Sequence, residues 1–296
     1  MNQDDRLIQG MAGEGDFRVI AAMTAGAAEE ARRRLDLSPV AAAAAARAMT
    51  GEVRLARLLD KDLSTQRVTL RFEGGGPLGL LVAEGTVRGE VRVFVSNPHV
   101  DDDARLDVGA AVGSTGKLTV VRAMPPAGAP YTSQVALVNG EIGRDLAHYL
   151  AHSEQIPTAV MLGQVMRPAG VAAAGGIVVQ TFPHTSRARI EAMEKRISEA
   201  PRLSTLLGTM AIEEAVGKVL TGFGFERLAR SHDVPVRFAC SCTREKAAGQ
   251  FRFLDREELH ELIAKDEGGE VVCQFCGEKY RFSTEELLAM APPPDA

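Results

Sequence analysis

The chain has 296 residues, enough for two domains and a connecting segment, and its 45% of hydrophobic residues is typical of a globular protein. Its net charge of −5 gives no general attraction to nucleic acid or to anionic membranes. No stretch approaches the ~20 apolar residues of a membrane span, and the first residues do not resemble a secretory signal. We therefore expect a soluble, cytoplasmic protein whose thiols stay reduced at rest.

Residues 1–185 are expected to form an N-terminal mixed α/β domain with an antiparallel-rich sheet, so the predicted fold class is α+β. Residues 17–23 predict an opening strand, and Thr24 is placed to cap a helix that runs through Arg34. Glutamates precede arginines in this helix, a charge order that the helix dipole favours.

A second helix is predicted to begin at Ser38 and Pro39, a capping residue followed by proline at the first helical position. It continues to about Leu59 through the alanine run at residues 41–46. Such a run is typical of a helix packed closely on its neighbours, and low-complexity disorder is the alternative.

From Gln66 the apolar period changes to two, which predicts strands. A phosphate-binding loop is an alternative for Gly74-Gly75-Gly76-Pro77, but the lysine and the following helix of such loops are missing. A hairpin turn is the better interpretation. The predicted strands cover residues 67–72, 78–83, 86–95, 116–122 and 132–138.

A helix over residues 141–153 and strands at residues 159–162 and 175–183 complete the predicted domain. His148 and His152 lie one helical turn apart, a spacing that can bind a metal ion. No further ligand motif accompanies them, so we interpret them as surface or second-layer residues.

Residues 186–235 are expected to form a helical linker with a thin apolar stripe and nearly balanced charges, eight Lys or Arg against seven Asp or Glu. Helices are predicted at residues 186–197, 203–207 and 211–220. An ordinary helical connector and a marginally stable linker both fit this pattern, because such helices depend on tertiary packing.

Residues 236–296 hold all four cysteines and are expected to form a small C-terminal zinc-binding domain. Cys240 and Cys242 form a C-x-C pair, and Cys273 and Cys276 form a C-x-x-C pair. Two close pairs separated by a segment are typical of a tetrahedral site with four thiolate ligands, for which zinc is the preferred metal. Space-filling thiols are the simpler alternative, and a disulfide framework suits short exported domains better than this chain.

The rest of this domain predicts two short capped helices. Asp255 with Glu258, and Ser283 with Glu286, each combine a capping residue with a glutamate three positions later. Gly268 and Gly269 are expected to end the first helix. Helices this short bury little apolar area, so zinc, which contributes ~10–16 kcal/mol in structural sites, is expected to decide whether the domain folds.

The segments from Arg237 to Lys246 and from Cys273 to Phe282 resemble the carboxyl motif of the thirty-three-kilodalton heat-shock protein family of bacterial redox-regulated chaperones. Further likeness at the early helix and at residues 131–140, 153–158 and 174–180 extends the resemblance over nearly the whole chain. It implies one zinc ion in a reduced, inactive state. Oxidants would then release the metal, form disulfides and expose a surface that holds unfolding proteins.

The same resemblance implies the partners: unfolding client proteins, a second copy of the chain when oxidised, and an ATP-dependent foldase that takes over the client. Because the members of each cysteine pair are neighbours in sequence, we predict that oxidation joins Cys240 to Cys242 and Cys273 to Cys276. A disulfide between residues two apart closes a small ring and is expected to be labile. The sequence does not identify the client-binding residues.

Two alternatives to a chaperone without enzymatic turnover come from other classes of protein. A zinc ribbon that binds nucleic acid is disfavoured by eight Lys or Arg against twelve Asp or Glu in residues 236–296. A thiol-disulfide oxidoreductase would use Cys273 and Cys276, but the βαβ setting of such motifs is absent from the sequence pattern.

Overall fold

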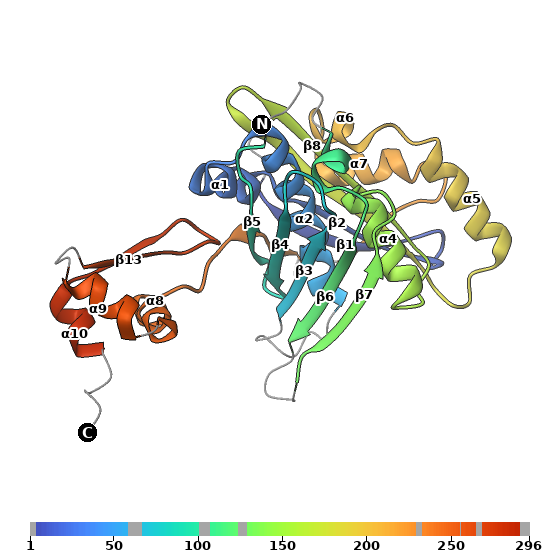
Figure 1. Ribbon diagram of the computed structural model, residues 1–296. Helices are drawn as coiled ribbons and strands as arrows, with labels where there is room; N and C mark the ends of the chain where they lie inside the picture. The colour runs from blue at the N-terminus through green and yellow to red at the C-terminus, as the bar shows by residue number, and fades with distance from the viewer. Residues whose placement is uncertain are drawn as a thin grey trace. The chain divides into compact units, whose positions relative to one another are not determined.

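The computed structural model describes residues 4–58, 67–100, 107–123, 129–228, 233–254, 256–264 and 268–290. Contacts along the backbone divide the chain into two compact units, residues 1–239 and residues 240–296. The first unit contains two largely antiparallel sheets with helices, and the second contains a two-stranded sheet with short helices (Figure 1). The predicted α+β fold class is confirmed.

One sheet of the first unit includes a strand that the sequence pattern did not reveal, β1 (Arg6–Ala12). Its alternation is broken because Gln9 is buried together with Leu7 and Ile8. The predicted strands at residues 159–162 and 175–183 are present, and both are longer than expected. The order in this sheet is β10 (Glu226–Arg227), β1, β2 (Phe17–Met23), β9 (Gly170–Thr181) and β8 (Thr158–Arg167), and β11 (Val234–Pro235) also pairs with β1.

The other sheet contains the strands predicted from the period of two. Its order is β12 (Arg237–Phe238), β5 (Glu90–Val95), β4 (Leu80–Thr86), β3 (Arg67–Glu73), β6 (Lys117–Ala123) and β7 (Tyr131–Ala136). All neighbours are antiparallel except β12 and β5.

The predicted hairpin turn between β3 and β4 is confirmed, and its glycines have a second role. A Cβ atom on Gly74 would lie 2.3 Å from the carbonyl oxygen of Val112, and one on Gly76 would lie 2.4 Å from that of Ala111. Val112 ends α3 (Val108–Val112), a short helix that was not predicted. Glycine is therefore required because the turn lies directly against another segment of backbone.

Helix α2 (Pro39–Leu58) lies between the two sheets of the first unit and contacts strands of both. Its alanines at residues 41–46 are all buried, in agreement with the closely packed helix that was predicted. A helix that is apolar all round is a buried one, and small side chains let both sheets approach it. The same layer contains α1 (Ala25–Leu35) and α4 (Ile142–His152).

Thr24 and Ser38 directly precede α1 and α2, as predicted, but neither side chain makes the expected capping hydrogen bond. The Thr24 hydroxyl is hydrogen-bonded to the Thr50 hydroxyl and makes no cap. Asp5 replaces it, because its carboxylate accepts hydrogen bonds from the backbone N–H groups of Gly26 and Ala27, at 3.0 and 2.6 Å. The buried Ser38 hydroxyl has no partner among the described residues.

The helices predicted for the linker are present and cover the face of the first sheet opposite α2. They are α5 (Arg187–Ser198), α6 (Leu203–Leu207) and α7 (Ile212–Val219). Met193, Leu206 and Val216 share a buried apolar cluster with side chains of β1, β2 and β9. Arg6 on β1 also pairs with Glu213 on α7, at 2.9 Å. Residues 186–235 therefore belong to the first compact unit. That they act as a marginally stable linker stays a prediction.

The second unit is small, and its core contains only five buried side chains among its described residues: Ala247, Phe251, Leu259, Phe282 and Leu287. The predicted cap at Ser283 is confirmed: Glu286 N–H donates to Ser283 Oγ and Ser283 N–H donates to the Glu286 carboxylate. The cap predicted at Asp255 lies outside the described residues. The elements are α8 (Arg244–Ala248), η2 (Gly249–Phe253), α9 (Arg256–Ala264), β13 (Gly269–Val272), β14 (Lys279–Phe282) and α10 (Thr284–Met290).

The described helices include none that is long and apolar enough to cross a bilayer.

Glu52 on α2 is a carboxyl group that is completely buried between the sheets. It faces Gly85 on β4, where a Cβ atom would lie only 1.7 Å from Glu52 Oε2. Neither carboxyl oxygen has a partner among the described side chains. Burial, and next the negative charge of Glu84, raise the pKa of Glu52 well above its usual value of 4.5.

A raised pKa in the folded state means that Glu52 is most favourable to folding below pH 4.5, and that this contribution is lost as the pH rises. We therefore predict that Glu52→Gln raises the free energy of unfolding by about 1–3 kcal/mol at pH 7.5. The gain should shrink toward zero near pH 4.5. Urea titrations over this pH range measure it, with the partly exposed Glu73→Gln as control. A gain that does not change with pH would contradict the assignment.

Candidate metal centre

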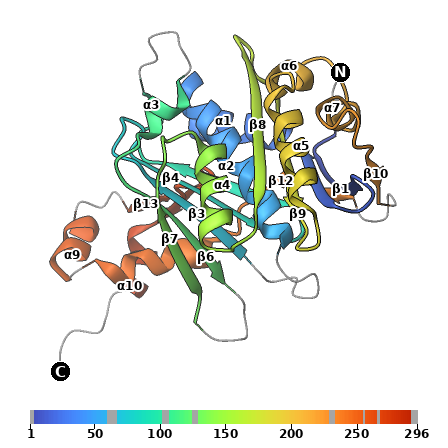
Figure 2. The ribbon, with the colours of Figure 1, turned by 90° about the vertical axis from the view of Figure 1, so that its right-hand side faces the viewer.

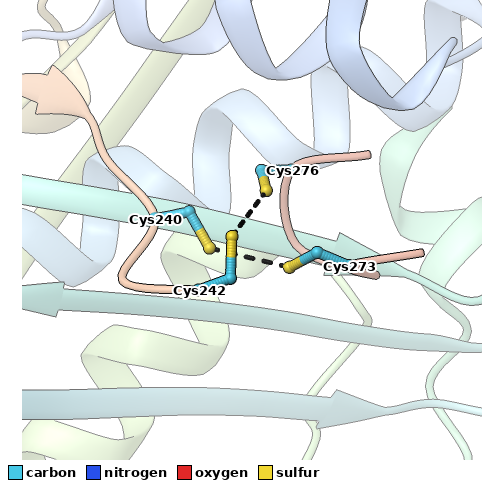
Figure 3. A group of neighbouring side chains, drawn as sticks. All are labelled: Cys240, Cys242, Cys273 and Cys276. Carbon is cyan, nitrogen blue, oxygen red and sulfur yellow. Dashed lines mark hydrogen bonds between the residues drawn. The ribbon is translucent and has the colours of Figure 1, made fainter. Parts of the chain in front are cut away.

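The four cysteines of the second unit come from two segments that lie far apart in sequence (Figure 3). Cys240 and Cys242 precede α8, and Cys273 and Cys276 lie in the turn that connects β13 to β14. Each segment supplies two sulfur atoms from a short stretch of backbone. The structure thus brings together all four of the predicted site residues.

Backbone hydrogen bonds shape the turn that carries Cys273 and Cys276. Cys273 N–H donates to the carbonyl of Glu278 and Gly277 N–H donates to the carbonyl of Cys273, both at 2.8 Å. Gly277 has a φ of 72°, in the left-handed region that glycine adopts without strain. The antiparallel pairing of β13 with β14 holds the two ends of the turn together.

The segment with Cys240 and Cys242 is held by the start of α8. Thr243 caps this helix by accepting a hydrogen bond from Lys246 N–H, and Lys246 Nζ donates to the carbonyl of Ser241 at 2.5 Å. Arg244 pairs with Glu286 on α10 and stacks over the ring of Phe282, 4.3 Å from its centroid. Through Arg244, the segment that carries Cys240 and Cys242 contacts both β14 and α10.

The sulfur atoms have the spacing that a tetrahedral metal site requires. Cys240 Sγ lies 3.7 Å from Cys273 Sγ, and Cys242 Sγ lies 3.4 Å from Cys276 Sγ. All four lie within 4.8 Å of one another, and none forms a disulfide. Zinc–sulfur bonds of about 2.3 Å in a tetrahedron place neighbouring sulfurs about 3.8 Å apart. The cluster can therefore hold one metal ion of this size.

The surroundings of the thiols favour their neutral form unless a positive charge is close. Burial raises the pKa of Cys273 and of Cys276, and the neighbouring thiol of Cys240 adds to both effects. Tyr280 on β14 donates a hydrogen bond to Cys242 Sγ at 3.2 Å. A bound cation would supply the missing positive charge and stabilise four thiolates together.

Tyr280 is a residue of the site that sequence reasoning did not single out. It lies within the motif after Cys276, but only the pairing of β14 with β13 shows that its hydroxyl reaches Cys242. Its spacing of two residues from the buried Phe282 along β14 is the signal that could have placed both side chains on the same, inner face of the hairpin.

The rings of His148 and His152 lie close together, with centroids 3.9 Å apart and planes tilted by 40°. Within the described parts of the chain, the cysteine cluster is the one group of three or more potential ligands close enough to share a metal ion. His148 is half-buried and His152 is exposed, which agrees with their interpretation as surface or second-layer residues.

The setting of Cys273 and Cys276 differs from that of thiol-disulfide enzymes. Both residues lie in the turn of an antiparallel hairpin, between β13 and β14. Catalytic C-x-x-C motifs instead follow a strand and begin a helix, which helps to lower the pKa of the first thiol. Here burial raises the pKa of Cys273, so the geometry favours a ligand over a catalytic nucleophile.

The family model described as Hsp33 protein matches residues 5–283 of the chain. The chain belongs to the Hsp33 family. Relatives named 33 kDa chaperonin include one from Thermus thermophilus, which is 47% identical over 96% of this chain and 86% of its own length. The 33 kDa chaperonin of Bacillus velezensis is 37% identical over 96% of this chain and 97% of its own length.

A solved Hsp33 structure has the same fold. The Hsp33 homologue of Thermotoga maritima, also titled 33 kDa chaperonin, superposes with a TM-score of 0.89 at 33% identity. The alignment covers 97% of this chain and 98% of the other. The resemblance found at the carboxyl motif is therefore confirmed over nearly the whole chain.

We predict that the reduced Hsp33 chain binds one metal ion, and that Cys240→Ser or Cys273→Ser lowers its affinity by more than about 100-fold. Losing a direct ligand costs more than losing an outer partner of a ligand, which already costs 10–100-fold. Elemental analysis and competition with a chromophoric chelator measure this. Ser241→Ala, between two cysteines, is the matched control and should bind normally. Metal-free protein after careful reduction without chelators would contradict the site.

Proposed function

We propose that this Hsp33 chain is a redox-regulated, ATP-independent holdase, which binds unfolding proteins after its thiols are oxidised and zinc is released. Membership of the Hsp33 family and relatives named 33 kDa chaperonin support a chaperone. The observation that carries the redox part is the gathering of all four thiols of the chain in one unit with a very small core. The proposed action is binding without enzymatic turnover.

Zinc is the proposed metal because all the ligands would be sulfur. Thiolates favour soft or borderline metals, and zinc accepts four of them without a geometric preference of its own. Cys240, Cys242, Cys273 and Cys276 would hold one ion. When bound, zinc would join the two segments of the unit and stabilise their thiolates.

The folding of the second unit would depend on these four thiolates. Its buried core of five side chains is too small to stabilise a unit of this size by burial alone. A structural zinc site contributes ~10–16 kcal/mol of apparent binding free energy, which exceeds the stability of most whole domains. Loss of the thiolate ligands would therefore unfold the unit.

Oxidation would remove the ligands in pairs. Two thiolates give two electrons to an oxidant such as hydrogen peroxide and form one S–S bond, while the peroxide takes up the electrons and two protons to become water. Each disulfide removes two ligands from the site. Three of the four cysteines are half-buried rather than fully buried, so small oxidants can reach them.

The unfolding would then spread to the segment before the cysteines. Helices α5–α7 cover an apolar cluster on the first sheet, and the chain runs from α7 through short strands to Cys240. Undocking of these helices would expose apolar surface to unfolding client proteins. A second copy of the oxidised chain and an ATP-dependent foldase are the further proposed partners, and the cytoplasm is the proposed location.

The disulfide pairing is a test of this proposal. We predict that peroxide joins Cys240 to Cys242 and Cys273 to Cys276, because sequence neighbours remain close after the unit unfolds. In the reduced structure the shortest sulfur–sulfur distances join the two segments instead, between Cys240 and Cys273 and between Cys242 and Cys276. A reaction in the folded unit would therefore give these links. Peptide mapping by mass spectrometry decides between them. Disulfides between the two segments would hold the second unit folded, which would contradict the proposed unfolding on oxidation.

The switch itself predicts four linked changes on oxidation. Zinc leaves, residues 240–290 lose structure, amide protons between about residues 186 and 233 lose exchange protection, and aggregation of an unfolding client is suppressed. Light scattering of a thermally unfolding client measures the last change, which should be unaffected by ATP and reversed by reductant with zinc.

The control is Ser241→Ala, which retains the four thiols and should switch normally, whereas Cys273→Ser should be loosened without oxidant. If the protein releases zinc under peroxide but never suppresses aggregation of a client, the holdase function is refuted and the metal site remains supported.

A further inference from the structure

A cavity of about 570 Å³ in the first unit lies outside everything proposed above. Its walls come from the start of α4, from Arg47 on α2, from β8, and from the connection between α5 and α6. Figure 2 shows β8 running between α4 and α6, both of which contact it. A volume of this size is within the range of sites that enclose a bound ligand.

The cavity runs along the edge of a sheet. It is lined by three consecutive residues of β8: Val160, Met161 and Leu162. Val160 and Leu162 pack against the core between the sheets, whereas Met161 packs against the cluster beneath α5–α7. Because successive side chains point to opposite faces of a strand, a cavity that reaches all three must lie beside the strand. Strand β8 is the last in the order of its sheet, with β9 on its other side.

The charged side chains of this edge groove are mostly positive. Arg47 is already engaged, because it pairs with Glu141 and donates to Gln164 Oε1 at 2.8 Å. Arg144 and Arg202 are exposed, line the groove from α4 and from the α5–α6 connection, and have no carboxylate partner among the described residues. The groove therefore carries two positive charges without a paired carboxylate, next to the apolar side chains of β8.

We propose that this edge groove binds an extended peptide segment with two adjacent acidic residues between apolar ones, which adds to β8 as a further strand. An edge strand offers unpaired backbone N–H and C=O groups that an extended peptide can satisfy, and side-chain contacts then select the sequence. Carboxylates of the peptide would pair with Arg144 and Arg202, and its apolar side chains would lie on Val160, Met161 and Leu162. As a subsite for clients, the groove rests on the proposed holdase function.

The test uses the full-length, zinc-loaded, reduced protein and dye-labelled five-residue peptides, with binding followed by fluorescence anisotropy. The probe is Val-Glu-Glu-Val-Thr amide with the dye on its N-terminus, and its two adjacent glutamates point to opposite faces of the added strand. It is compared with the same peptide carrying lysine in place of both glutamates, and with a version N-methylated at the central residue. We expect the acidic peptide to bind and both other peptides to bind at least ten-fold more weakly.

Two variants locate the binding, and a third controls for a general loss of positive charge. Arg144→Met and Arg202→Met should each weaken binding of the acidic peptide roughly five-fold, the effect of one partly exposed ion pair. Arg167→Met removes an exposed arginine at the far end of β8 that does not line the groove, and it should bind normally. Thermal melting of all three variants confirms that each is folded.

Equal binding of the lysine peptide, or no effect of Arg144→Met and Arg202→Met, would overturn the charge selection and with it the proposal. Equal binding of the N-methylated peptide, or full displacement by inorganic phosphate alone, would show that the groove recognises a small anion and not a strand. The peptide measurement needs neither oxidant nor client. A negative result would therefore not contradict the proposed redox switch. Peptide binding could likewise be measured even if the redox switch were refuted.

Discussion

Four sulfur atoms within 4.8 Å of one another are the constraint on which the second unit depends. Its other stabilising features are weak: a core of five buried side chains, one reciprocal helix cap and a few exposed ion pairs. Exposed pairs contribute little, and a core of this size offsets little chain entropy. A cation shared by the thiols would therefore supply most of the free energy that keeps the two cysteine segments together, and a reaction that removes the thiolates would also destabilise the fold of this unit.

The first unit is stabilised in a different way. Helix α2 lies in a core formed by side chains of both sheets, and its alanines let the sheets approach closely. Loss of the second unit would leave this core intact. The outer layer of α5–α7 buries an apolar cluster on the other face of the first sheet and adds ion pairs such as Arg6–Glu213. The proposed function requires that this layer can leave the sheet while the core around α2 stays folded.

The edge of the first sheet at β8 adds a different kind of surface. Apolar clusters between layers become accessible only when a layer leaves, whereas a strand edge can accept a peptide while the fold stays closed. Arg202 and Leu203 belong both to this groove and to the segment that covers the sheet. Ligand binding at the edge and docking of the cover are therefore linked through shared residues, and each would influence the other's equilibrium.

Local chemistry determined much of this protein from its sequence. The spacing of the cysteines predicted which residues gather, the period of two predicted the strands of the second sheet, the alanine run predicted a buried helix, and Ser283 with Glu286 predicted a cap. Each of these signals depends on residues close together in the chain. Tertiary structure decided the rest, because the partners come from distant segments. Asp5 caps α1 in place of Thr24, Gly85 makes room for Glu52, Tyr280 reaches Cys242, and β8 becomes an edge only through the order of strands in its sheet.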